Sequence, residues 1–170
     1  MISDEALMLD FQRGSRQAFE ELFARYREPL YGFFRRRLAS GESADDLTQE
    51  TFLAVIRATS RYEPRALVRT YLYGIAFKLL AAERRRRARD QSADLSPISS
   101  DHSDDRLWVR QALDRLDAND REILMLREYE QLSYMEIAEL LRLPVNTVRS
   151  RLFRARMELK STLAPAKGEA

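Results

Sequence analysis

The 170-residue sequence contains no cysteine, a single histidine, five glycines and no hydrophobic run of membrane-spanning length. Without cysteine, disulfides and thiolate metal sites are excluded, and His102 lies in a polar segment where a solvated imidazole is expected. No apolar run approaches the roughly 20 residues that a membrane-spanning helix needs, and Asp4 and Glu5 do not fit the basic start of a secretory signal. We therefore expect a cytoplasmic protein with no metal, no cofactor and no membrane insertion.

Charge is abundant and unevenly distributed. Residues 1–89 carry 17 basic and 12 acidic side chains, residues 90–105 carry none and 5, and residues 106–170 carry 12 and 10. Most of the cations are arginine, which suits phosphate and base recognition. The acidic segment, DQSADLSPISSDHSDD, has no apolar periodicity. The pattern predicts helical domains at 1–89 and 106–163, a flexible acidic linker at 90–105, and a tail at 164–170.

The most informative stretch runs from Ser133 to Arg156, SYMEIAELLRLPVNTVRSRLFRAR. Ser133 and Glu136 form an S-x-x-E capping box, so a helix should begin at Tyr134. Leu143 and Pro144 should end it, because proline disfavours helical geometry in the preceding residue. A basic helix follows at once, and this order predicts a DNA-reading helix-turn-helix.

Helical spacing divides the basic helix into two faces. Val148, Leu152 and Ala155 should point inward. Arg149 and Arg154 should point outward, so replacing either with alanine should leave stability nearly unchanged. The residues predicted to contact DNA are Asn146, Thr147, Arg149, Ser150, Phe153 and Arg154. The alternative interpretation is a solvated basic helix at the end of a bundle.

Residues 1–89 read as four helices, which makes the fold class all-α. Ser3 caps a first helix to about Gln12, and a second follows Gly14-Ser15, with Pro29 interrupting it. Ser43 is expected to cap the third, and the fourth runs from about Leu67 to Arg87.

The third helix, ADDLTQETFLAVI, carries acidic residues on one face. Asp46 and Glu50 lie one turn apart, but two carboxylates without further oxygen ligands make a poor cation site. A protein-docking surface is the better interpretation. On the fourth helix, aromatic residues alternate with cations, as in single-strand binding proteins, and a core helix with a solvated basic tail is the equal alternative.

In this order the motifs ADDLTQETFLAVI, Thr70 to Ile75 and Leu132 to Arg156 resemble a bacterial RNA polymerase sigma factor of the small extracytoplasmic-function group. The resemblance spans Ser3 to about Leu163. It implies core RNA polymerase and promoter DNA as partners and leaves open an anti-sigma factor. It also implies that the acidic linker threads toward the polymerase active-site cleft.

The resemblance assigns roles to matching positions. Contact with core polymerase falls on Asp45, Asp46, Leu47, Gln49, Glu50 and Phe52. Contact with the melted downstream promoter element falls on Arg61, Tyr62, Arg65, Arg69, Tyr71, Tyr73 and Lys78. The helix-turn-helix residues named above would read the upstream element. The chain departs from the family pattern at Tyr71, Lys78 and Arg142, which replace the usual tryptophan, asparagine and glycine, and Arg142 must adopt turn geometry.

Two other classes of function compete with this one. A stand-alone helix-turn-helix regulator would share the C-terminal motif but would not need residues 1–89. An enzyme acting on nucleic acid is weakly supported, because the sequence shows no nucleophile with a base, no metal cluster and no glycine-rich phosphate loop.

Overall fold

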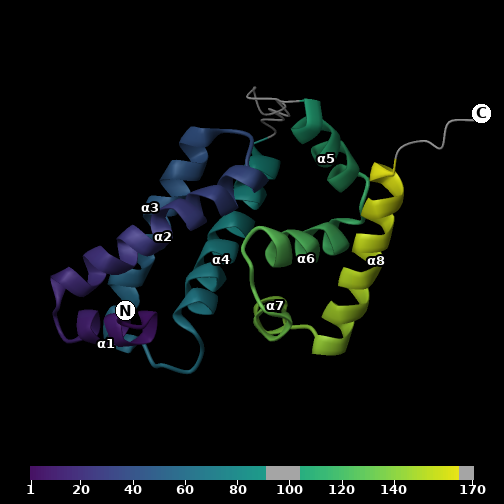
Figure 1. Cartoon of the computed structure of the whole chain (residues 1–170). Coiled ribbons are helices and arrows are strands. Elements are labelled where there is room, and N and C mark those ends of the chain that lie inside the picture. The colour runs from purple at the N-terminus through teal and green to yellow at the C-terminus, as the bar shows by residue number, and fades with distance from the viewer. Residues whose placement is uncertain (91–103, 165–170) are drawn as a thin grey trace, which may run out of the picture. The chain divides into compact units, whose positions relative to one another are not determined.

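The computed structural model of the chain describes residues 1–90 and 104–164 (Figure 1). Within those residues it contains eight α-helices, one short 3-10 helix and no β-strand. The predicted all-α fold class is confirmed. Contacts between Cα atoms divide the chain into two units, residues 1–98 and 99–170. In the described ranges, no helix combines the length and the apolar character needed to cross a membrane.

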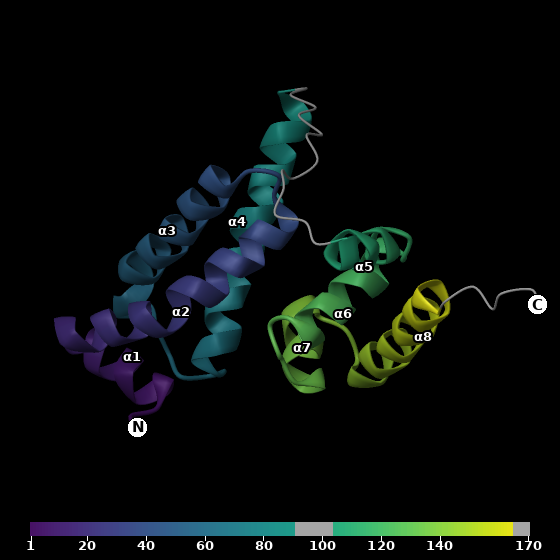
Figure 2. The ribbon, with the colours of Figure 1, turned by 45° about the horizontal axis from the view of Figure 1, so that its top comes forward.

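The first unit is built from four α-helices and the 3-10 helix. They are α1 (Asp4–Gln12), α2 (Arg16–Arg37), α3 (Gly41–Ala58), η1 (Thr59–Arg61) and α4 (Val68–Arg89). Ser3 and Ser15 cap α1 and α2 as predicted, because each hydroxyl accepts a hydrogen bond from the backbone three residues ahead. Helices α2 and α3 run side by side (Figure 2). The core of this first unit includes five fully buried side chains, Met8, Leu30, Phe33, Phe34 and Leu80.

Two predictions for this unit were wrong in detail. Helix α3 begins at Gly41, and its cap is Ser40, whose Oγ accepts from the Ser43 backbone at 3.4 Å. Serine caps equally well at either position, so the local sequence did not distinguish them. Helix α2 also continues through Pro29, since Tyr26, Leu30 and Phe33 are buried on both sides of the proline and hold the two halves to one core.

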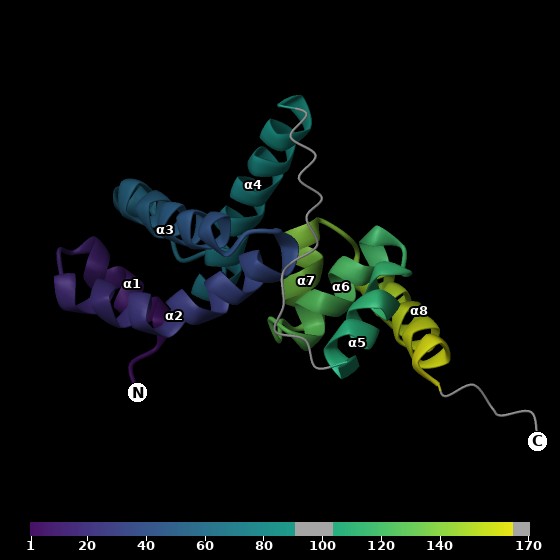
Figure 3. The same cartoon turned by 90° about the horizontal axis from the view of Figure 1, so that it is seen from above.

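The second unit contains α5 (Asp104–Asp114), α6 (Ala118–Glu128), α7 (Tyr134–Leu141) and α8 (Val145–Leu163). Helix α8 packs against the other three, and Figure 3 shows it from above. The largest fully buried side chains of this second unit include Ile123, Leu126, Leu132, Ile137 and Leu152. Most of the predicted linker, residues 91–103, lies outside the described residues, and its last two residues open α5.

Candidate functional site

Helix α7 begins where the capping box predicts. The Ser133 hydroxyl accepts from the Glu136 backbone N–H at 3.1 Å, and the Glu136 carboxylate accepts from the Ser133 backbone N–H at 2.6 Å. Two of the N–H groups that a helix start leaves unpaired are satisfied reciprocally. The predicted start at Tyr134 is confirmed.

The turn between α7 and α8 centres on Arg142. Its backbone adopts the left-handed conformation, with φ 55° and ψ 48°, and the next backbone N–H, of Leu143, donates to the Ala138 carbonyl at 2.9 Å. This C-cap normally favours glycine, because a side chain at positive φ is strained. The expectation that an arginine takes the turn geometry is confirmed. Pro144 then precedes α8.

Helix α8 has the two faces predicted from its spacing. Val148, Leu152 and Ala155 are buried, with at most 1% of each residue exposed. Five of the predicted DNA-contacting residues are exposed: Asn146, Arg149, Ser150, Phe153 and Arg154. Phe153 is 68% exposed, which packing within this unit does not explain. Together these side chains present donors, acceptors and one apolar ring of the kinds that read base edges in the major groove.

Arg154 differs from the other residues of that face. Its guanidinium binds the Asp120 carboxylate of α6 through two hydrogen bonds, each 2.8 Å long. The Asp120 side chain is only 1% exposed, and this pairing raises the pKa of Arg154 above its usual value. A buried carboxylate depends on such a partner. The expectation that Arg154 contributes little to stability did not include this pair, which joins α8 to α6, and we now expect its removal to be destabilising.

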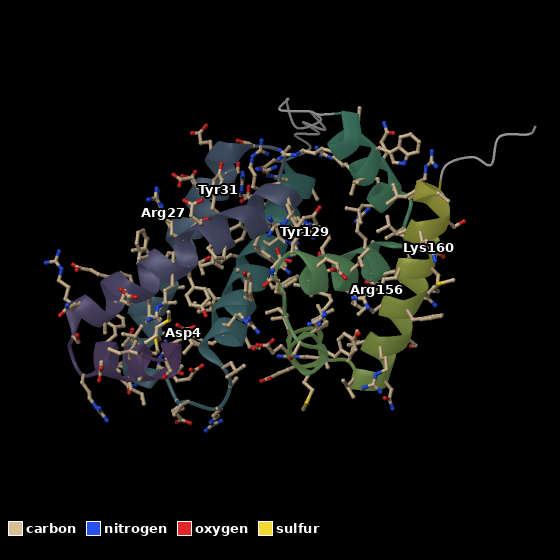
Figure 4. The ribbon with its side chains drawn as sticks, in the orientation of Figure 1. Asp4, Arg27, Tyr31, Tyr129, Arg156 and Lys160 are labelled. Atoms are coloured by element: carbon tan, nitrogen blue, oxygen red, sulfur yellow. The ribbon has the colours of Figure 1, made fainter. Side chains whose placement is uncertain are left out.

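Asp120 was not among the predicted functional residues. Its position near the start of α6, after the N-cap Asp117, is the usual place for a carboxylate that favours the helix dipole. Nothing local distinguishes that role from a partner for Arg154, which is 34 residues away. A similar contact lies farther along α8, where Arg156 donates to Glu128 at 2.7 Å (Figure 4).

The exposed face of α3 is acidic and partly apolar. Asp45, Asp46, Gln49 and Glu50 are exposed on it. The same helix exposes Leu53 and Ile56, at 42% and 46%. Ile56 was not among the predicted contact residues. It lies three residues after Leu53, and this helical spacing places both side chains on the same face of α3. Apolar side chains bordered by carboxylates are typical of a protein-docking surface.

Two other residues predicted for this contact are less accessible. Leu47 is half-buried, and Phe52 is 4% exposed. The Phe52 ring packs against Phe23 and Phe19, with centroids 4.7 and 6.2 Å away. Phe52 thus supports the acidic face from within and does not form part of its surface.

The predicted downstream-element residues gather around the segment between α3 and α4 and on α4 itself. Arg61, Arg65 and Lys78 are exposed, while Arg69 and Tyr71 are half-buried. Burial raises the pKa of the Tyr71 hydroxyl, and the neighbouring Arg61 opposes that shift. Exposed cations beside an accessible tyrosine ring can hold an unstacked nucleic-acid strand.

Tyr62 and Tyr73 are buried, at 6% and 2% exposure. The Tyr62 ring packs edge-on against Tyr71, with centroids 5.2 Å apart, and Tyr73 packs against Phe33 at 5.5 Å. Two of the three predicted tyrosine rings are thus enclosed by the unit, and only Tyr71 is half-buried. Helical spacing did not predict the burial of Tyr73 because α4 packs against α1, α2 and α3.

At its C-terminal end α4 carries a run of arginines, and part of that charge is neutralised within the helix. Glu83 accepts hydrogen bonds from Arg86 and from Arg87, with shortest distances of 2.7 and 2.9 Å. These hydrogen bonds lower the pKa of Glu83 to about 2, and the bond with Arg86 makes the larger contribution to this shift. Arg87 also donates to the Ser43 hydroxyl of α3 at 2.8 Å. Arg87 therefore links two helices.

No described part of the chain assembles three or more histidine, aspartate or glutamate side chains into a group that could hold a metal ion.

Two family models match the chain. The model for sigma-70 region 2 matches residues 22–90, and the model for sigma-70 region 4 matches residues 106–159. The first covers α2 from residue 22 onward together with α3 and α4, and the second covers the helix-turn-helix. Helix α1 lies before the first matched region.

Characterised relatives align along almost the whole length. The RNA polymerase sigma-H factor of Pseudomonas aeruginosa is 34% identical over 98% of this chain and 97% of its own. RNA polymerase sigma factor YlaC of Bacillus subtilis is 30% identical, over 91% and 96%. The ECF RNA polymerase sigma-E factor of Escherichia coli is 29% identical, over 96% of each.

Two solved structures share the fold. CnrH, in complex with the cytosolic domain of CnrY, has a TM-score of 0.72 and 27% identity, covering 94% of this chain and 96% of that one. The sigma factor RpoE of Bartonella quintana, in complex with the anti-sigma factor NepR, has a TM-score of 0.70 and 25% identity, covering 85% and 96%.

Proposed function

We propose a function from one premise, that the chain belongs to the sigma-70 family of RNA polymerase sigma factors and to its extracytoplasmic-function group. As a sigma factor it binds core RNA polymerase and directs promoter recognition and transcription initiation. It is an initiation factor and not itself the catalyst. It acts where core polymerase and promoter DNA are found, in the cytoplasm.

One observation carries the assignment of surfaces. A single chain combines the acidic and apolar face of α3 with a second unit whose α8 exposes Asn146, Arg149 and Phe153. In our proposal residues 1–89 bind core polymerase and the downstream element, and residues 106–163 bind the upstream element. Residues 90–105 are the linker between these two domains. A stand-alone helix-turn-helix regulator would leave the α3 face without a role.

For core polymerase we propose the surface formed by Asp45, Asp46, Gln49, Glu50 and Leu53, extended by Ile56. For the melted downstream strand we propose Arg61, Arg65, Arg69, Tyr71 and Lys78. Leu47, Phe52, Tyr62 and Tyr73 support these surfaces from inside the unit. For the upstream element we propose Asn146, Thr147, Arg149, Ser150 and Phe153 as readers, with Arg154 holding α8 in place.

The core-binding assignment is tested by charge reversal on α3. Asp46→Lys with Glu50→Lys should weaken binding to core polymerase by at least about tenfold, because complementary charges become repulsive. The matched control is Glu20→Lys with Glu28→Lys, which makes the same charge change at exposed positions of α2. Affinity is measured with fluorescently labelled protein, followed by run-off transcription on genomic fragments. Equal affinity for the α3 variant and the control would contradict the assignment.

We further propose that an anti-sigma protein regulates this chain. The support is that a similar solved structure, that of RpoE from Bartonella quintana, is a complex with an anti-sigma factor. Co-expression with a candidate anti-sigma protein should abolish run-off transcription and yield a stoichiometric complex in gel filtration. A mixture that transcribes fully would rule out that candidate.

A further inference from the structure

Helix α1 precedes the region matched by the sigma-70 region 2 model, yet its side chains reach three other elements of the unit. Asp4 fastens α1 to α2, because its carboxylate accepts hydrogen bonds from the Tyr26 hydroxyl and from Arg25, the latter at 2.8 Å. Figure 4 labels Asp4. Met8 is fully buried on the inner side of α1. The helix is thus held at a fixed place against the core.

From that place α1 holds the start of the segment that leads to α4. The Gln12 side-chain amide donates to the Thr59 carbonyl at 2.9 Å and to the Tyr62 carbonyl at 2.8 Å. Both protons of the Gln12 NH₂ group therefore form hydrogen bonds. One side chain thus binds the first residue of η1, Thr59, and the residue after η1, Tyr62. Figure 1 shows this segment passing α1 on its way to α4.

The same helix holds the other end of the segment. Val68 is the first residue of α4, and its backbone N–H donates a hydrogen bond to the Glu5 carboxylate at 3.0 Å. The residue before it, Leu67, offers no side-chain cap. Glu5 therefore supplies, from 63 residues away, the acceptor that a helix start normally finds nearby.

We propose that α1 positions the segment 61–68 for the melted promoter strand, with Glu5 and Gln12 as positioning residues. The inference rests on the proposed function, since that segment carries Arg61 and Arg65 of the downstream surface. Fixing both ends of a segment before it binds removes part of the ordering cost of binding. Helix α1 would therefore contribute to promoter opening without contacting DNA.

The variants separate hydrogen bonding from side-chain bulk. Gln12→Glu keeps the shape of the side chain but places carboxylate oxygens against two carbonyl oxygens. Glu5→Ala removes the acceptor for Val68, whereas Glu5→Gln retains an amide oxygen that can accept the same bond. Gln17→Glu on α2, an exposed glutamine, is the matched control for Gln12→Glu.

The experiment uses full-length protein assembled with core polymerase. Three quantities are measured: affinity for core, affinity of the holoenzyme for a single-stranded oligonucleotide carrying the nontemplate downstream element of an active promoter, and run-off transcription from duplex and pre-melted templates. Thermal melting monitored by circular dichroism verifies that each variant is folded.

We expect Gln12→Glu and Glu5→Ala to lower oligonucleotide affinity and duplex transcription by about tenfold, with core affinity unchanged. A pre-melted template should restore much of the transcription, and Glu5→Gln should behave like the unmodified protein. Variants that bind the oligonucleotide normally, or that lose core affinity in parallel, would overturn the positioning role. If the unmodified protein failed to support promoter-dependent transcription, the proposed function would fail instead.

Discussion

Arg149 and Arg154 lie on the same helix, and the structure gives them different surroundings. Arg149 is exposed, with Asn146 as a distant hydrogen-bond acceptor at 3.4 Å and the Tyr134 ring 6.0 Å away. Arg154 is bound to the buried Asp120. Arg149 is therefore available to a ligand, whereas Arg154, although its side chain is 58% exposed, is already paired with Asp120.

Arg154→Ala should lower the melting temperature of the protein by roughly 5 °C or more, because it leaves the Asp120 carboxylate buried and unpaired. Arg149→Ala should change it little. Circular dichroism melts of both variants provide the measurement. In the double variant Arg154→Ala with Asp120→Asn, part of the loss should be recovered. Equal melting temperatures for the two single variants would contradict this account.

Transcription then distinguishes the two arginines. If Arg149 makes two hydrogen bonds to a guanine, Arg149→Ala should remove roughly 1 to 3 kcal/mol of recognition energy for the promoter. Transcription from that promoter should fall accordingly. A contact to phosphate alone would weaken all upstream sequences alike and make the salt dependence shallower.

Glu83 gives the N-terminal unit a defined response to acid. Its pKa is about 2 in the folded protein against 4.5 ordinarily, since it accepts hydrogen bonds from Arg86 and Arg87. A lowered folded-state pKa stabilises the protein above the unfolded-state value, and this contribution is lost as the pH falls. Glu83→Gln should therefore be less stable at pH 7, with the difference shrinking below about pH 4.5 and vanishing near pH 2. Urea titrations across that range measure it, and a pH-independent difference would contradict the assignment.

At the scale of elements, the helix-turn-helix depends on one strained residue. Arg142 occupies a left-handed position that glycine adopts without penalty. Arg142→Gly should therefore raise the free energy of unfolding by roughly 0.5 to 1 kcal/mol. Glu139→Gly, in the interior of α7, is the control and should lower it by about 1 kcal/mol. Urea denaturation of both variants tests the pair, and a loss at both positions would contradict the strain argument.

At the scale of the whole molecule, free protein should bind duplex promoter DNA weakly. Residues 106–170 carry 12 basic and 10 acidic side chains, and some of those arginines are already paired, as Arg154 and Arg156 are. The net charge of these residues is only +2, and the release of counterions by protein cations supplies a large share of the affinity for DNA. Fluorescence anisotropy with and without core polymerase should show tight, specific binding only when core is present. Tight binding by the chain alone would favour a stand-alone regulator.

The sequence by itself determined the helical elements and the motif in which α8 is placed. Caps such as Ser133 and the spacing of Val148, Leu152 and Ala155 act within a few residues, so local sequence encodes them. The all-α class follows from the same signals. The unusual geometry of Arg142 was expected from the family resemblance, because the family often has glycine at that position of the turn.

Only the tertiary structure decided which polar side chains are available and which are used internally. The Asp120 to Arg154 pair joins residues 34 apart, and the bonds from Gln12 and Glu5 span 47 and 63 residues. Burial of Tyr62 and Tyr73 likewise depends on helices distant in the sequence. Helical periodicity specifies the faces of one helix but not what covers them. Partner choice among charged and aromatic residues therefore emerges only when the chain has folded.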